Sequence, residues 1–101
     1  LDDRIDREWM RIPHFYMGYY VYQYATGISA ASAIVDRITA EGADAADDYL
    51  SALEMGGSAY PVEVLERAGV DVTDAGYVEA AVDRYRARLD DLAGLVGDGA
   101  A

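Results

Sequence analysis

Apolar residues recur at spacings of three and four along much of the chain, which is typical of helices with one apolar side. The spacing is clearest over residues 28–38 and again over residues 78–95. No stretch alternates apolar and polar residues for long enough to indicate a β-strand. The pattern therefore predicts an all-α fold of four to five helices with short connections.

Glycine and proline predict where these helices begin and end. Pro13 separates two of them, and Gly42, Gly56 and Gly69 are expected helix stops. Gly27 is expected to mark close packing or a bend within a long helix. The helices we expect span residues 2–10, 14–40, 45–55, 61–69 and 77–96.

Short polar residues next to the expected helices predict their caps. Ser58 is expected to cap the helix that begins near Pro61, and either Thr73 or Asp74 the last helix. We expect the tail from Gly97 to fray.

Length and composition limit the class of protein. The 101 residues suffice for one domain at most, and 52% of them are apolar, which is too many for a disordered chain. Without cysteine, a disulfide and a thiolate metal site are both excluded. No run of about eighteen uncharged apolar residues indicates a membrane span. The charged first ten residues do not resemble a secretory leader, so a cytoplasmic protein is the expectation.

The net charge of −11 combines nineteen acidic residues with eight basic ones, all arginine. Such a surface repels phosphate groups, which argues against binding to nucleic acids or to anionic membranes. Two explanations fit the charge: a halophilic surface adapted to concentrated salt, or a genome that prefers codons for arginine and alanine. The composition favours the first.

The sequence contains no complete catalytic motif. It has one histidine, no H-E-x-x-H pair for zinc and no D-x-D-x-D-G loop for calcium. It also has no G-x-S-x-G elbow and no phosphate-binding loop. We therefore expect this chain to bind no metal by itself.

Five of the nine tyrosines lie within residues 16–24, directly after His14. On a helix, Tyr16, Tyr20 and Tyr24 would share one stripe, with Tyr19 and Tyr22 beside it. Buried phenols need hydrogen-bond partners, so the stripe is either a packed interface or a cleft wall of hydroxyl donors. Spacing alone favours packing. In a cleft, the donors would stabilise a developing oxyanion.

Two longer blocks carry a resemblance to a known family. The blocks are "IPHFYMGYYVYQYATGISAA" and "ALEMGGSAYPVEVLERAGVD". They are similar to the C-terminal end of oligoendopeptidase F and the thimet-type zinc oligopeptidases, and a looser match extends to Leu95. The resemblance implies a helical metallopeptidase with a deep channel that hydrolyses short peptides. It also implies that the zinc site, an H-E-x-x-H motif with a further glutamate, lies upstream of the matched region.

The same resemblance assigns roles to individual residues. It implies that His14, Tyr16, Tyr20 and Tyr24 face the zinc across the cleft and act on the substrate, and that Tyr22 helps to bind it. Tyr20 is the first choice for the oxyanion donor, with its two stripe neighbours as alternatives.

Gly56, Gly57 and Ser58 form a second candidate region. Their ordinary role is to end one helix and cap the next. The resemblance also implies a contact between their backbone and a substrate peptide.

Two functions follow. In the first, residues 1–101 are a single helical segment of a peptidase catalytic domain that lacks the zinc-binding motif. Zinc and the short peptide substrate then belong to the full-length parent, and the segment alone is inactive. In the second, the chain is a stand-alone helical interaction module that forms a homo-oligomer through its aromatic face.

Overall fold

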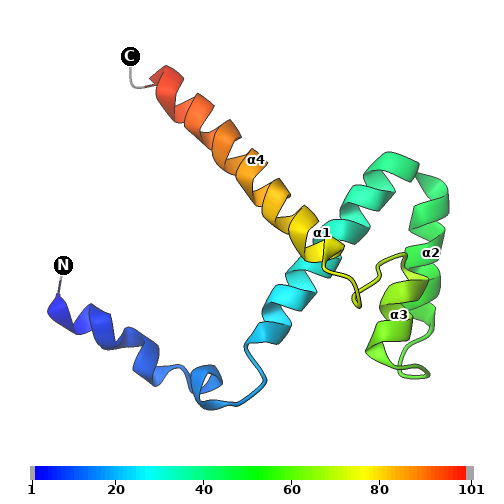
Figure 1. The fold of residues 1–101 in the computed structure, drawn as a ribbon, viewed down its shortest axis with the longest axis horizontal. Helices are drawn as coiled ribbons and strands as arrows, with labels where there is room; N and C mark the ends of the chain where they lie inside the picture. The colour runs from blue at the N-terminus through cyan, green and yellow to red at the C-terminus, as the bar shows by residue number, and fades with distance from the viewer. Residues whose placement is uncertain (1, 100–101) are drawn as a thin grey trace.

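The computed structural model describes residues 2–99, and these residues form helices joined by short connections (Figure 1). Two 3₁₀-helices, η1 (Asp3–Arg11) and η2 (Pro13–Tyr16), come first. Four α-helices follow: α1 (Tyr22–Glu41), α2 (Ala43–Glu54), α3 (Pro61–Arg67) and α4 (Gly76–Gly99). No β-strand occurs in this part of the chain, so the all-α prediction is confirmed.

The helices are arranged openly (Figure 1). α1 packs against both α2 and α4, and α2 packs against α3. Residues 2–21, here called the N-terminal arm, extend away from these helices. The radius of gyration is 18.2 Å, whereas a compact domain of this length has about 13 Å. The described residues therefore do not close around one central core.

The prediction of a helix over residues 14–40 is wrong at its beginning. α1 starts only at Tyr22, eight residues later than expected. Met17 is extended, and Tyr19 has a φ of 55°, a left-handed value that interrupts the helical hydrogen-bond ladder. Gly18, between them, adds the low helix propensity of glycine. The helix expected over residues 2–10 is present, but as the tighter 3₁₀ form.

Gly42 and Gly69 end α1 and α3 as predicted. Their φ values of 76° and 86° belong to the left-handed region that favours glycine. After α3 the Gly69 N–H donates to the Glu66 carbonyl and the Val70 N–H to the Leu65 carbonyl, each at 2.9 Å. This pair of bonds satisfies two carbonyls that the helix end leaves free.

Two details of the predicted helix ends need correction. Ser58 does not cap α3; its Oγ donates to the Met55 carbonyl at 2.6 Å, at the end of α2. The cap position is Tyr60, whose N–H donates to Oε2 of Glu63 at 2.9 Å. α4 also extends to Gly99, beyond the predicted helix end at residue 96; residues 100 and 101 lie outside the described residues.

Of the two candidate caps for α4, Asp74 makes the hydrogen bond. Its Oδ1 accepts from the Gly76 N–H at 2.7 Å. Thr73 instead donates to Oδ1 of Asp71 through both its N–H and its hydroxyl.

Small side chains occupy the contacts between helices. The residues of the described part that are at least nine-tenths buried are Ser29, Ala30, Ala45, Ala52, Ala68 and Val70. Small residues let helices approach closely, but each removes little apolar area from water. An added Cβ on Gly27 would meet nothing within 4 Å, so this glycine does not mark close packing.

Two arginines join the helices. Arg37 on α1 donates to Oδ2 of Asp48 on α2 at 2.7 Å and to the Ala68 carbonyl after α3 at 3.1 Å. Arg84 on α4 donates to Oδ1 of Asp36 on α1 at 2.6 Å. Long-range polar contacts therefore supplement the small core.

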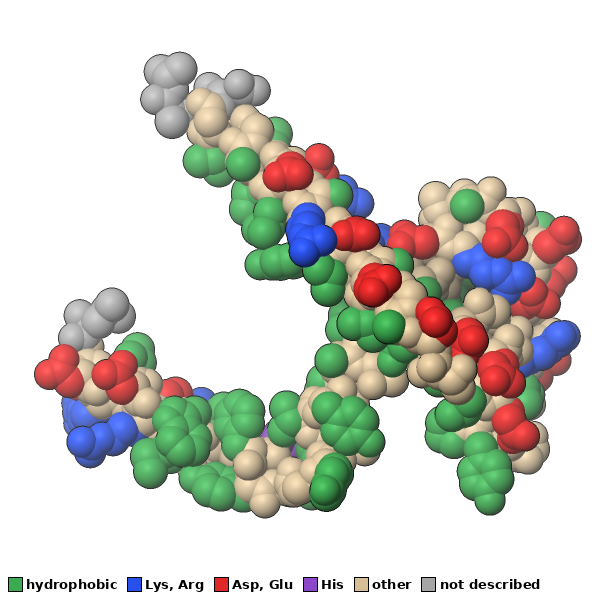
Figure 2. Space-filling model, in the orientation of Figure 1, with side chains coloured by type: hydrophobic (Ala, Val, Ile, Leu, Met, Phe, Trp, Pro, Cys, Tyr) green, Lys and Arg blue, Asp and Glu red, His purple; other side chains and the backbone are tan. Residues whose placement is uncertain are grey.

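The apolar stripe predicted on α4 lies largely in solvent. Val82 is 43% exposed and Leu95 is 75% exposed. Figure 2 shows hydrophobic side chains gathered along the edge of α4 that faces the N-terminal arm across open space. Within residues 2–99, no helix combines the length and apolarity that crossing a membrane requires.

Candidate functional site

Three aromatic rings meet where the N-terminal arm joins α1. The His14 ring stacks on the Tyr20 ring, with centroids 5.3 Å apart and planes 6° apart. Tyr24 completes the group edge-on, with its centroid 6.1 Å from His14 and 5.9 Å from Tyr20. Such edge-to-face and offset contacts are favourable arrangements for aromatic rings. We call these three residues the aromatic cluster.

The local backbone explains how a histidine before the helix reaches a tyrosine on it. Pro13 starts η2, in which the Met17 N–H donates to the His14 carbonyl at 3.3 Å. The left-handed Tyr19 then turns the chain, and the Gln23 N–H donates to the Tyr20 carbonyl at 3.1 Å. The turn thus places Tyr20 beside His14, while Tyr24 projects from the first turn of α1.

The other tyrosines of the segment lie elsewhere. Tyr16 donates its hydroxyl to the Met10 carbonyl at 2.8 Å, which ties η2 to η1. Tyr22 is 61% exposed and Tyr19 is 94% exposed. The prediction that Tyr16, Tyr20 and Tyr24 share a helical stripe is therefore wrong, because residues 16–20 are not α-helical.

A hollow of about 170 Å³ lies next to the cluster, lined by Tyr20, Gln23 and Tyr24. Nothing in the sequence pattern singles out Gln23, because a glutamine at the start of a helix is ordinary.

The surroundings of the Tyr24 phenol favour its neutral form. Hydrogen bonding with the Tyr20 side chain, followed by partial loss of hydration, raises the pKa of the Tyr24 phenol above its ordinary value. The first turn of α1 contains no acidic residue.

The second candidate region lies apart from the cluster. A hollow of about 470 Å³ lies at the turn that connects α2 to α3, and it is lined by Gly57, Ser58, Ala59, Tyr60 and Glu63. Gly56 does not line it and has a φ of 52°. In Figure 1 this α2–α3 turn and the N-terminal arm are well separated, so the structure does not bring the two predicted regions into one site.

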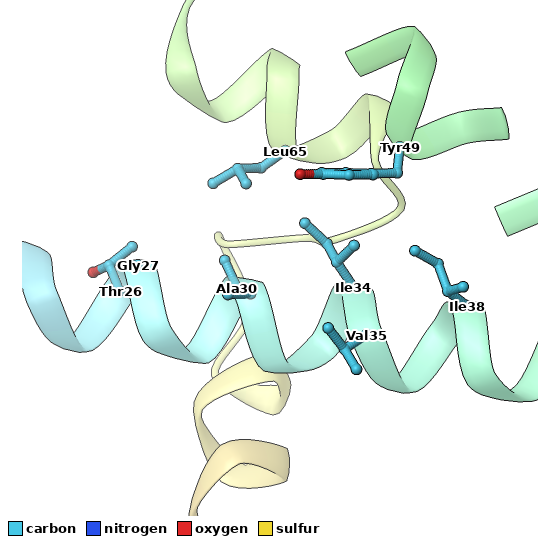
Figure 3. Close-up of a pocket in the computed structure, with 9 residues that line it drawn as sticks. Thr26, Gly27, Ala30, Ile34, Val35, Ile38, Tyr49 and Leu65 are labelled. Atoms are coloured by element: carbon cyan, nitrogen blue, oxygen red, sulfur yellow. The ribbon is translucent and has the colours of Figure 1, made fainter. Parts of the chain in front are cut away.

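A third depression is an apolar groove of about 390 Å³ along α1. Tyr49 from α2 and Leu65 from α3 lie opposite Ala30 and Ile34 of α1 (Figure 3). The groove contains none of the predicted site residues.

The sequence model of Peptidase family M3 matches residues 2–84. The chain belongs to this family. Oligopeptidase PepF of Bacillus subtilis (strain 168) is 49% identical over 96 residues, which cover 95% of this chain and 14% of the relative. Group B oligopeptidase PepB of Streptococcus agalactiae is 46% identical, with 94% of this chain and 16% of the relative covered.

The plasmid-encoded oligoendopeptidase F of Lactococcus lactis subsp. cremoris is 43% identical, over 94% of this chain and 16% of the relative. The resemblance to oligoendopeptidase F is thereby confirmed. The chain spans 14–16% of the length of these curated relatives. No solved structure matches it.

The described residues do not fit the zinc site that the resemblance implies for the family. Within residues 2–99, no group of three or more histidine, cysteine, aspartate or glutamate side chains is placed to hold a metal ion. His14, the one histidine, is stacked on a phenol instead. The aromatic cluster itself offers one imidazole and two phenol groups for hydrogen bonding.

Proposed function

We propose that this chain forms one wall of the substrate cleft of a family M3 metallopeptidase that hydrolyses short peptides. The aromatic cluster of His14, Tyr20 and Tyr24 is the observation that carries the proposal. The zinc ion of such an enzyme would be held by residues outside this chain. The relatives that support the proposal are named oligopeptidases and oligoendopeptidases.

In this proposal Tyr20 and Tyr24 act as neutral hydrogen-bond donors. A carbonyl oxygen gains negative charge when a peptide bond is attacked, and a donor already aimed at that oxygen stabilises the transition state more than the substrate. The pKa of the Tyr24 phenol is raised above its ordinary value, so this group is in its neutral, hydrogen-bond-donating form at neutral pH. His14, fixed by stacking on Tyr20, offers a ring N–H to a peptide carbonyl.

Tyr16 and Tyr22 have a weaker place in the proposed cleft. Tyr16 already donates to the Met10 carbonyl, so we propose that it holds the arm in shape. Tyr22 is exposed beside the cluster and would contact a substrate only at the edge of the cleft. Gly57 and Ser58 line a separate hollow, and we propose backbone contact with peptide there only as a second, distant subsite.

The exposed apolar faces support the same proposal. A monomer rarely exposes a large contiguous apolar surface, yet Tyr85, Leu89 and Leu92 of α4 are all about half exposed. In the full-length enzyme, the remaining part of the catalytic domain would cover them.

A chimaera tests the proposal. This chain replaces the matching C-terminal segment of the Bacillus subtilis oligopeptidase, and hydrolysis of a fluorogenic short peptide is measured. We expect the chimaera to hydrolyse the peptide and the 101-residue chain alone to be inert. Peptide hydrolysis by the pure chain, or a folded chimaera that binds zinc but does not turn over, would refute the proposal.

The alternative is a helical module that self-associates through its apolar faces, which the same exposed residues favour. Sedimentation of the isolated chain distinguishes the two. A stable dimer of fixed stoichiometry would support the module, whereas a monomer or a mixture of aggregates would support the cleft wall.

A further inference from the structure

Gln23 is the polar side chain of the small hollow that the proposed mechanism does not use. The hollow is lined by Gln23 together with Tyr20 and Tyr24. Its backbone N–H donates to the Tyr20 carbonyl at 3.1 Å, which fixes the backbone of Gln23 one turn after that of Tyr20. The side-chain hydrogen bonds of the arm and of α1, within the described residues, join other groups and leave its carboxamide available to a ligand.

We infer that the Gln23 carboxamide binds one peptide unit of the substrate, with its NH₂ donating to the carbonyl oxygen and its oxygen accepting from the peptide N–H. This inference rests on the proposed function, because it takes the hollow to be part of a peptide-binding cleft. It adds a residue that determines specificity: one that distinguishes a peptide bond from other carbonyl groups.

The chemistry of the three side chains supports this assignment. A protonated phenol offers a carbonyl oxygen one donor, but offers a peptide N–H only a weak acceptor. A carboxamide carries a strong acceptor and two donors, so it complements both polar groups of a peptide unit. Being uncharged, it also binds that unit irrespective of the charge of neighbouring substrate side chains.

The sequence provides a direct spectroscopic test. Gln23 is the only glutamine, and the chain contains no asparagine. The zinc-free chimaera, labelled with ¹⁵N in these 101 residues alone, thus gives a single pair of carboxamide signals, and the variant Gln23→Leu verifies their origin by removing them. The ligands are a capped alanine tetrapeptide and analogues in which one peptide bond at a time is replaced by an ester.

We expect the Gln23 signals to shift saturably with the tetrapeptide. One ester position should weaken binding by about three- to tenfold, the usual worth of one neutral hydrogen bond. Binding to the Gln23→Leu variant is followed through the ring signals of Tyr20. In this variant the ester analogue and the parent tetrapeptide should bind with equal affinity. A purely structural role for Gln23 would not produce this selective loss of discrimination.

Two results would overturn the inference. Ring signals of Tyr20 and Tyr24 that move while the Gln23 signals stay fixed would exclude Gln23 and leave the proposed cleft intact. Equal ester discrimination in the unsubstituted chimaera and in Gln23→Leu would do the same. An inactive, well-folded chimaera would instead count against the proposed function itself.

Discussion

The N-terminal arm and the helical unit of α1, α2 and α3 are organised in opposite ways. In the helical unit, small side chains are buried and Arg37 connects three segments of the chain. In the arm no residue is buried, and Trp9 and Phe15 are each 53% exposed. Yet the arm supplies His14 and Tyr20, two of the three rings of the aromatic cluster. Stability and candidate chemistry are therefore carried by different residues.

This division has a physical consequence. Substitutions in the arm remove few contacts that hold the helices together, so their effect on unfolding should be small. Substitutions at the contacts of Arg37 should destabilise the helices without touching the cluster. The predictions below test that separation, beginning with the largest expected effect.

The largest effect concerns activity in the chimaera. Tyr20→Phe removes one hydroxyl from the cluster and should lower kcat by about 10²–10³-fold if Tyr20 is the oxyanion donor. The melting temperature should hardly change, because Tyr20 lies in the arm. Tyr19→Phe is the matched control, since this phenol is 94% exposed and outside the cluster. A Tyr20→Phe chimaera with full kcat would exclude this role and leave Tyr24 as the donor to test.

The second prediction concerns Gly69. Its φ of 86° disfavours any residue with a Cβ, and an added Cβ would lie 2.0 Å from Nη1 of Arg37. Gly69→Val must therefore strain the turn and displace the guanidinium from the Ala68 carbonyl. We expect a loss of about 2–4 kcal/mol, measured by thermal unfolding followed by circular dichroism.

Gly94 provides the control for this substitution. It lies within α4, and an added Cβ would meet nothing within 4 Å. Gly94→Ala should therefore raise stability by about 0.5–1 kcal/mol. If Gly69→Val unfolds at the same temperature as the native chain, the turn after α3 does not depend on Arg37.

A smaller effect is expected for Arg37→Lys. The guanidinium bonds at once to Asp48, to Glu41 at 3.2 Å and to the Ala68 carbonyl, and its side chain is only 25% exposed. A lysine ammonium lacks this fork of donors, so we expect a loss of about 1–2 kcal/mol in chemical denaturation.

Arg86→Lys is the comparison for Arg37→Lys. Arg86 pairs with Asp83 on the same helix and is 71% exposed. Exposed pairs contribute little, so the change should stay within about 0.5 kcal/mol. Similar losses for the two arginines would show that the joints between helices are no stronger than surface pairs.

The helical unit could be predicted from sequence much better than the arm. The stops at Gly42 and Gly69 and the position of Pro61 follow from local backbone preferences, and the structure contains all three. The start of α1 could not be predicted in this way. Apolar spacing and the absence of proline after Pro13 favour a helix over this stretch. The left-handed backbone of Tyr19 cannot be predicted from the residue type, because tyrosine has no preference for a positive φ.

The candidate site shows the same limit. Helical spacing grouped Tyr16 with Tyr20 and Tyr24, but the turn replaced Tyr16 by His14 as the neighbour of those rings. The residue types were visible in the sequence, while their grouping depended on one φ angle. Gln23 carries no signal in the sequence, because a glutamine at the start of a helix is ordinary and only the hollow that it lines sets it apart.

The smallest expected effect is on the pKa of Tyr24 within the aromatic cluster. Hydrogen bonding with Tyr20, together with partial loss of hydration, raises the pKa of Tyr24 above its ordinary value of 10.0. A raised pKa means that the native cluster favours the neutral phenol, so its contribution is present below pH 10 and is lost as the pH rises through the native pKa of Tyr24. In Tyr20→Phe, the pKa of Tyr24 should fall toward 10.0, measured from its ring carbon shifts by NMR. Tyr19→Phe should leave that pKa where it was. Because the arm contributes little to the stability of the helical unit, the melting temperature should not change as Tyr24 titrates. A melting temperature that falls with the same pH midpoint would mean that the arm and the helices unfold together. Stability and candidate chemistry would then not be carried by separate regions.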